Sequence, residues 1–213
     1  MKLAVFSDVH GNLPALKAML NDTGVVDGYI SLGDVVNYGP WANECVEVIA
    51  GLPNVIMLRG NHEEYFLAGK YDGTNEVAKA FFDHCYPVFT PTDLIANLPA
   101  DYKLNNFTFS HTINNQYVYA DSTITLDSNY VIGHSHHQFK IEQLPFVLYN
   151  PGSVGQNRKY INVINYLLLE TETMECEFKS LTYDESLVIQ EMRTRNYPQL
   201  CIEYYDNKER LRF

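Results

Sequence analysis

Residues 2–12, KLAVFSDVHGN, place a short apolar run directly before a group of polar residues. Residues 2–7 are predicted to form a buried strand, because an apolar run of this length ends at a polar turn. A helix is predicted to follow, with Asn12 as its N-cap and apolar residues at helical spacing at Leu13, Leu16, Met19 and Leu20. Asp8 and His10 then lie at the carboxyl end of the first strand.

The same order repeats along the first half of the chain. Residues 29–32 and 55–58 are predicted strands, and residues 41–50 form a predicted helix that begins after Pro40. An alternation of strands and helices predicts parallel pairing with right-handed crossovers.

The second half has a different texture. A helix is predicted over 75–86. Residues 90–93 resemble a capping box and predict a short helix that ends near 97. A second capping box, which begins at Thr182, predicts a helix that ends at about 195. Segment 196–213 has no assignment. Short strands are predicted at 106–110, 116–119, 129–133, 145–149, 161–169 and 174–181. We therefore predict one α/β domain over 1–213, with one sheet from each half and helices outside.

Potential metal ligands follow these strands. They are Asp8, His10, Asp34, Asn61, His62, His111, His134 and His136. In open α/β sheets, sites gather at the carboxyl ends of strands, and ligands two residues apart in extended chain share one side. An isolated Asp-x-His is usually a helix cap or a solvated pair, but an ordered series after successive strands is hard to explain in that way. His84 and His137 break this pattern and are expected to be structural or surface residues.

The donor types indicate the kind of metal. Imidazole, carboxylate and amide donors without thiolate suit Mn, Fe, Zn, Co or Ni better than Mg or Ca. The set is too large for one tetrahedral ion and suits two ions that share a bridging carboxylate.

Composition limits the partners. Lys plus Arg number 15 and Asp plus Glu number 26, which gives a net charge of −11. An acidic chain without a basic run is not expected to bind extended nucleic acid or an anionic membrane. We see no signal peptide or membrane-spanning run, and the four cysteines lie far apart, so we expect a cytoplasmic protein with reduced thiols.

Several motifs together resemble the calcineurin-like metallophosphoesterase superfamily, in particular its small bacterial branch of diadenosine tetraphosphatase-like and phosphodiesterase-like proteins. They are SDVHGN (7–12), GDVVNYGP (33–40), RGNHE (59–63), SHT (110–112), GHSH (133–136) and NPGSVGQ (150–156). The resemblance implies a four-layer αββα sandwich with two mixed sheets flanked by helices. It assigns one metal to Asp8, His10, Asp34 and His136, and the second to Asp34, Asn61, His111 and His134.

The resemblance also implies a reaction. A hydroxide that bridges two divalent ions attacks phosphorus in line, Asn61 orients the phosphate, and His62 is not a ligand but a general acid toward the leaving oxygen. The expected substrates are small-molecule or nucleotide phosphomonoesters or phosphodiesters. The alternative is a non-catalytic metal-binding scaffold in a protein assembly, although the presence of His62 argues against it. The excess of acidic over basic residues argues against a nuclease.

Three positions depart from the resemblance. Asn37 and Tyr38 stand where the protein Ser/Thr phosphatase branch has Asp and a phosphate-binding Arg, and Thr112 stands where Gly is usual. A typical protein phosphatase is therefore not expected. Arg158, just after the closing loop, is a candidate to bind a second anionic group of the substrate. The natural substrate, its preference for monoester or diester, the native metal and the oligomeric state stay open.

Overall fold

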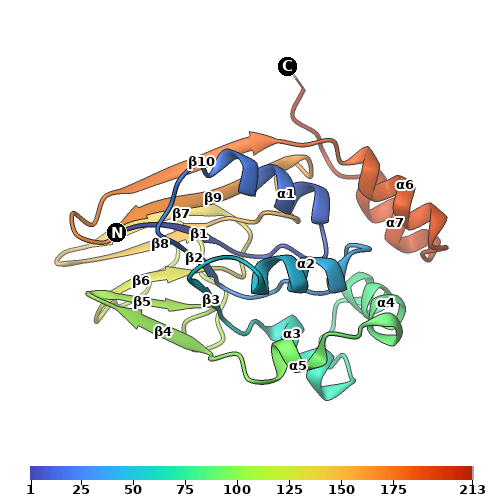
Figure 1. Cartoon of the computed structure of the whole chain (residues 1–213), viewed down its shortest axis with the longest axis horizontal. Helices are drawn as coiled ribbons and strands as arrows, with labels where there is room; N and C mark the ends of the chain where they lie inside the picture. Colours follow the sequence, from blue (N-terminus) through green and yellow to red (C-terminus); the bar gives the residue numbers. More distant parts are fainter. Residues whose placement is uncertain (213) are drawn as a thin grey trace.

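The computed structural model describes residues 1–212, and its first sheet contains the predicted parallel strands (Figure 1). β1, β2 and β3 pair in parallel, and β9 and β10 add antiparallel strands beyond β1, so that the order is β10-β9-β1-β2-β3. The bounds are Lys2–Phe6 for β1, Gly28–Ser31 for β2, Val55–Met57 for β3, Val163–Glu170 for β9 and Cys176–Thr182 for β10.

The second sheet comes from the middle of the chain, in the order β4-β5-β6-β8-β7. Its central strands β5, β6 and β8 are parallel, and its edge strands β4 and β7 are antiparallel. The bounds are Asp101–Leu104 for β4, Phe107–Ser110 for β5, Asn129–Ile132 for β6, Gln138–Gln143 for β7 and Phe146–Pro151 for β8. The prediction of two mixed sheets with helices is confirmed. The prediction that each half forms its own sheet is wrong, because β9 and β10 of the second half pair onto β1 and complete the first sheet.

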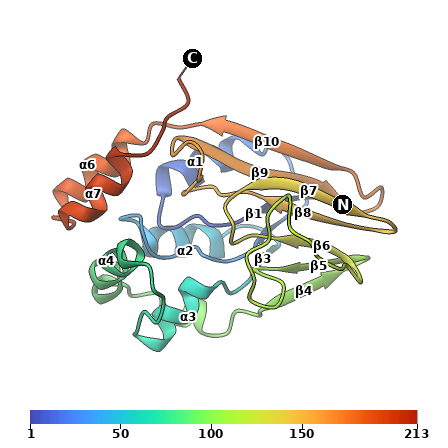
Figure 2. The ribbon, with the colours of Figure 1, turned by 180° about the vertical axis from the view of Figure 1, so that it is seen from behind.

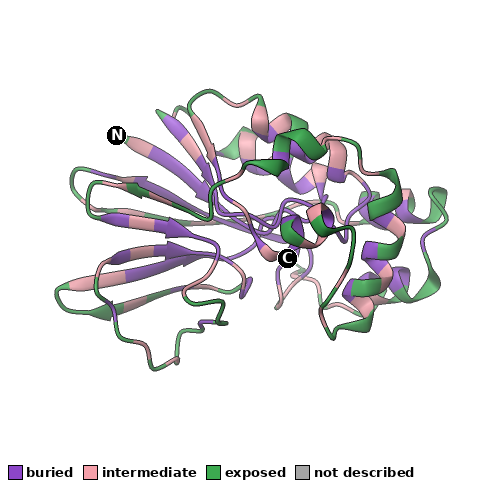
Figure 3. Ribbon diagram, turned by 90° about the horizontal axis from the view of Figure 1, so that it is seen from below, coloured by how far each residue is buried: buried purple, intermediate pink, exposed green. Residues whose placement is uncertain are grey.

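Side chains alternate between two cores along β1. Ala4 and Phe6 pack with apolar side chains of α1 and α2, which cover the outer face of the first sheet (Figure 1). Leu3 and Val5 point the other way, into a core that the two sheets share with Phe107 and Phe109. In Figure 3, the buried residues follow the strands between the sheets. α1 spans Leu13–Asp22 and α2 spans Ala42–Ala50.

The remaining helices gather near the end of the sheets at which the parallel strands terminate (Figures 1 and 2). They are α3 (Asn61–Ala68), α4 (Glu76–Cys85), the 3₁₀ helix η1 (Tyr86–Val88), α5 (Thr92–Ala96), α6 (Ser186–Thr194) and α7 (Gln199–Asp206). No helix in the described part of the chain is long and apolar enough to cross a membrane.

Several local predictions are wrong. Residues 116–119 form no strand, and their segment packs Val118 irregularly against the outer face of the second sheet. Thr182 does not cap a helix, because it continues β10 opposite Val163. Thr90 does not cap α5, because Pro91 occupies the N-cap position and α5 has no side-chain cap hydrogen bond. Strands β4 and β7 and helices α3 and α7 were not predicted. Phe213, at the end of the unassigned segment 196–213, lies outside the described residues.

Candidate metal centre

The predicted ligands meet where parallel strands of both sheets end. Asp8 and His10 follow β1, Asp34 follows β2, His111 follows β5, and His134 and His136 follow β6. Asp8, His10, Asp34, His134 and His136 all have a positive φ, between 48° and 69°. Left-handed backbone is unfavourable for residues with a side chain, and such strain is concentrated at functional sites. These tight bends direct side chains from separate loops into one place.

We use ligand group for a set of side chains that could hold a metal ion, and the first of these contains Asp8, His10 and His136. Asp8 Oδ1 lies 3.3 Å from His136 Nε2 and 3.9 Å from His10 Nε2, and the two Nε2 atoms are 3.3 Å apart. The other oxygen of Asp8 accepts a hydrogen bond from the His134 N–H at 3.1 Å. One carboxylate oxygen is therefore fixed by the backbone, and the second faces the imidazoles.

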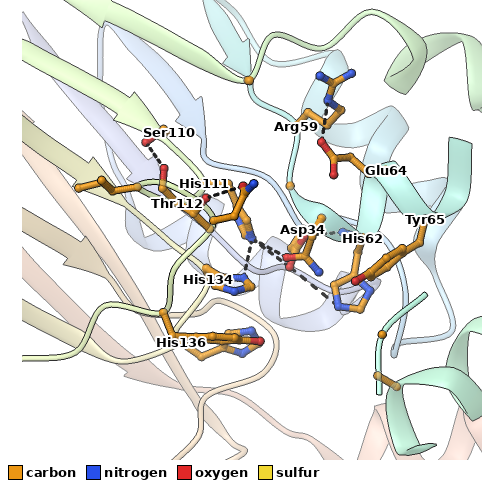
Figure 4. A pocket seen from close by; sticks show the side chains of 18 of the residues that line it. Asp34, Arg59, His62, Glu64, Tyr65, Ser110, His111, Thr112, His134 and His136 are labelled. Carbon is orange, nitrogen blue, oxygen red and sulfur yellow. Dashed lines mark hydrogen bonds and ion pairs between the residues drawn. The ribbon is translucent and has the colours of Figure 1, made fainter. Parts of the chain in front are cut away.

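The second ligand group contains Asp34, His111 and His134 (Figure 4). Asp34 Oδ2 lies 3.2 Å from His111 Nε2, which is 3.1 Å from both His134 Nδ1 and the Asn61 side-chain oxygen. Asp34 Oδ2 also lies 4.0 Å from His10 Nε2 of the first group. The Asp34 carboxylate thus stands between the two groups.

The hydrogen bonds of the imidazoles fit a metal site. The Nδ1 atoms of His10, His111 and His136 lie 3.0, 3.0 and 2.7 Å from backbone carbonyl oxygens, which can only accept. These contacts place the proton of each neutral ring on Nδ1 and leave an Nε2 lone pair directed at the site. Lone pairs of His10 and His136 that face each other repel unless a cation lies between them. The buried Asp8 Oδ1 also has no hydrogen-bond partner among the described residues. The residues present therefore fit divalent transition-metal ions.

Burial and charge shift the pKa values of these ligands. Burial raises the pKa of the Asp8 carboxyl to about 7 and lowers the pKa of His134 to about 4. Burial also opposes protonation of His111, but the Asp34 carboxylate beside it outweighs this effect and raises its pKa to about 9. Metal binding near neutral pH would therefore displace a proton from His111 and compete with a proton at Asp8, but it would displace none from His134.

His62, at the start of α3, belongs with His10 and Asp34 to a third group that could hold a metal ion. Its Nε2 is 4.0 Å from Asp34 Oδ2, and burial lowers its pKa. Asn37 Nδ2 lies 3.0 Å from His62 Nδ1 and 3.2 Å from the Ala78 carbonyl oxygen. Because the carbonyl can only accept, the Asn37 amide donates to both atoms, and His62 carries its proton on Nε2. Asn37 therefore sets the tautomer that directs an N–H toward the pocket.

Glu63 is a supporting residue to which sequence reasoning gave no role, although it lies within the RGNHE motif. Its buried carboxylate accepts from the backbone N–H groups of Asp34, Val35 and Gly60, at 2.7 to 2.8 Å. A side chain at Gly60 would place its Cβ 2.2 Å from Asp34 Oδ1. The Glu63 carboxylate therefore fixes the loop that carries Asp34, and position 60 has room for glycine only.

Asp34, Asn61, His111, His134 and His136 form the floor of a pocket of about 700 Å³, and tyrosines together with Arg59 and Arg158 line its wall. Tyr65 and Tyr71 stand on one side, near His62, with ring centroids 4.8 Å apart. Tyr117, from the irregular segment after His111, stacks on the His134 ring at 3.9 Å. His84 and His137 lie outside the ligand groups found in the described residues.

Comparison with known proteins agrees with this geometry. A family model described as calcineurin-like phosphoesterase matches residues 1–153. The chain belongs to the calcineurin-like phosphoesterase family. It is thus a metal-dependent phosphoesterase, and its Asp and His groups are positioned to bind the metal.

Relatives of this phosphoesterase extend over nearly the whole chain. An uncharacterized protein of Methanocaldococcus jannaschii is 32% identical over 215 residues, which cover 85% of this chain and 88% of that protein. A metallophosphoesterase from Sphaerobacter thermophilus has 26% identity and a TM-score of 0.81, covering 97% of this chain and 98% of that one. A hypothetical protein of Pyrococcus horikoshii shares the fold at 17% identity, with a TM-score of 0.80 and coverage of 96% and 97%.

Proposed function

We propose that this phosphoesterase uses two divalent transition-metal ions to hydrolyse phosphate monoesters or diesters of small molecules or nucleotides. The position of Asp34 carries the proposal, because its Oδ2 atom faces His10 in one ligand group and His111 in the other. A carboxylate between two ligand groups suits a bridging role. One ion would be held by Asp8, His10, Asp34 and His136, and the other by Asp34, Asn61, His111 and His134.

Two bound ions would supply positive charge at the phosphoryl group and a nucleophile from water near neutral pH. The protein supplies the orientation. The Asn61 side-chain oxygen is turned toward His111, so its amide N–H can hold a phosphate oxygen. His62 Nε2 faces the pocket, where the imidazolium form of His62 can give its Nε2 proton to the leaving oxygen as a general acid and become neutral.

The donor set favours Mn, Fe, Zn, Ni or Co. The net charge of −11 favours a small substrate over extended nucleic acid or a membrane surface. The cysteines are free in the structure, which accords with a cytoplasmic location.

Hydrolysis of bis-p-nitrophenyl phosphate and of p-nitrophenyl phosphate tests the proposal. Wild type and His62→Ala would be assayed at equal Mn²⁺ content, with His84→Ala as a matched control because His84 lies outside the site. We expect metal-dependent activity that falls by about 10²–10⁴-fold in His62→Ala, the usual contribution of a general acid, and is retained in His84→Ala. A metal-loaded wild type that hydrolyses neither ester would contradict the proposal and favour the scaffold alternative.

A further inference from the structure

Of the two arginines that line the pocket, Arg59 is paired with the Glu64 carboxylate and Arg158 has no paired carboxylate among the described residues. Arg59, Arg193, Arg195 and Arg210 each lie within 4 Å of a carboxylate. Within residues 1–212, Arg158 has no carboxylate at that distance. Its recorded side-chain hydrogen bond is to a neutral group, the Tyr204 hydroxyl, at 2.8 Å. A partly buried guanidinium without a paired anion is costly unless a ligand supplies the negative charge.

The guanidinium faces the metal centre. Arg158 lines the same pocket as Asp34, His62 and His136. A fixed cation here also repels metal ions. The arrangement is favourable when an anion lies between the arginine and the metals, as a phosphoryl group would.

Helix α7 holds this arginine in place. The Tyr204 hydroxyl accepts from Arg158 and donates to the Gln156 side-chain oxygen at 3.0 Å. The backbone oxygen of Gln156 in turn accepts from Nδ1 of His136 at 2.7 Å. On the pocket side, the buried Tyr38 phenol faces the guanidinium. Burial raises the pKa of Tyr38, and the charge of Arg158 opposes that rise.

We propose that Arg158 binds a non-bridging oxygen of the substrate phosphoryl group, and that Tyr204 is the positioning residue that holds its guanidinium at the pocket. The proposal rests on the proposed function for the identity of the anion. It makes the C-terminal helix part of the substrate site. Arg158 can donate two N–H groups to phosphate while a third remains on Tyr204, because a guanidinium has five.

Calorimetric titration of inorganic phosphate into Mn²⁺-loaded protein tests this inference without an activity readout. Arg158→Gln is expected to weaken phosphate binding by about ten- to a hundredfold, the range for a lost hydrogen bond to a charged group. Arg158→Lys should retain part of the affinity. Arg193→Gln, which removes one surface arginine, should bind phosphate as wild type does.

Tyr204→Phe separates positioning from a structural role. We expect weaker phosphate binding and a raised KM, with no further loss when Arg158→Gln is added, because both changes act on one contact. Thermal unfolding would show that each variant is folded. An Arg158→Gln variant that binds phosphate as tightly as wild type would overturn the inference, and so would a loaded wild type that binds none. Additive losses would overturn the role of Tyr204. Wild type that binds phosphate through Arg158 yet hydrolyses no ester would refute only the proposed function.

Discussion

The floor and the wall of the pocket are held by different means. On the floor, backbone groups fix the side chains, as when His10 contacts the Val36 carbonyl and Glu63 binds the N–H of Asp34. On the wall, side chains hold one another, as Tyr204 holds Arg158 and Tyr117 stacks on His134. Both regions depend on contacts between segments that lie far apart in the chain. They differ in that the floor residues belong to short motifs after strands, whereas Tyr117 and Tyr204 lie outside such motifs.

The largest effect is expected from protons that compete with metals on the floor. Metal binds the deprotonated ligand, so apparent affinity falls as pH drops below each pKa, which is about 9 for His111 and about 7 for Asp8. From pH 8 to pH 6, we expect about a hundredfold loss at the His111 group and about a tenfold loss at the Asp8 group. Calorimetric Mn²⁺ titrations in buffers of different ionisation enthalpy would measure the affinities and the protons released. Constant affinity over this range would contradict competition between protons and metal at Asp8 and His111.

Glu63→Gln tests whether support from behind the floor matters. The substitution replaces a carboxylate that accepts hydrogen bonds from the backbone N–H groups of Asp34, Val35 and Gly60. We expect metal affinity to fall by about 10–100-fold, as for other residues that orient metal ligands. The exposed Glu64→Gln neighbour serves as the control in the same Mn²⁺ titration. Equal affinities for the two variants would break the proposed link between backbone support and the metal centre.

Asn37→Asp tests the tautomer of His62 at the junction of floor and wall. A carboxylate there would accept a hydrogen bond from the Nδ1–H of protonated His62 and so oppose the effect of burial, which lowers the pKa of His62. We expect a rise of about one unit or more, so the limb of the pH–rate profile that reports the protonated acid moves to higher pH. Asn43→Asp, on α2, adds the same charge away from the site. If the profile of Asn37→Asp matches that control, Asn37 does not govern His62.

The smallest effect is expected on the wall. Tyr117 is 58% exposed and can pack against an aryl group of the substrate. Tyr117→Ala should raise KM for bis-p-nitrophenyl phosphate by about three- to tenfold, the strength of one aromatic contact, with little change in metal content. Tyr119→Ala removes a neighbouring ring that does not line the pocket. A large loss of metal in Tyr117→Ala would instead assign this residue to the floor.

Sequence reasoning predicted the floor because each ligand follows a strand and carries a recognisable donor. Even where it missed a helix, as at α3, Asn61 and His62 were still predicted at the strand end. It could not predict Tyr204 or Tyr117, because one lies in a tail of mixed tyrosines and charges and the other in an irregular segment. Their positions depend on tertiary contacts, which local periodicity does not encode. Arg158 was found only through its place after a motif.

The number of metal ions required for activity tests the account most directly. Mn²⁺ would be added in stoichiometric steps to metal-free protein, while bound metal and hydrolysis of bis-p-nitrophenyl phosphate are measured together. The account predicts that activity saturates at two equivalents per chain, and that Asp34→Asn neither binds both ions nor reaches that activity. Full activity at one equivalent, or an Asp34→Asn variant that binds two ions as tightly as wild type, would contradict it.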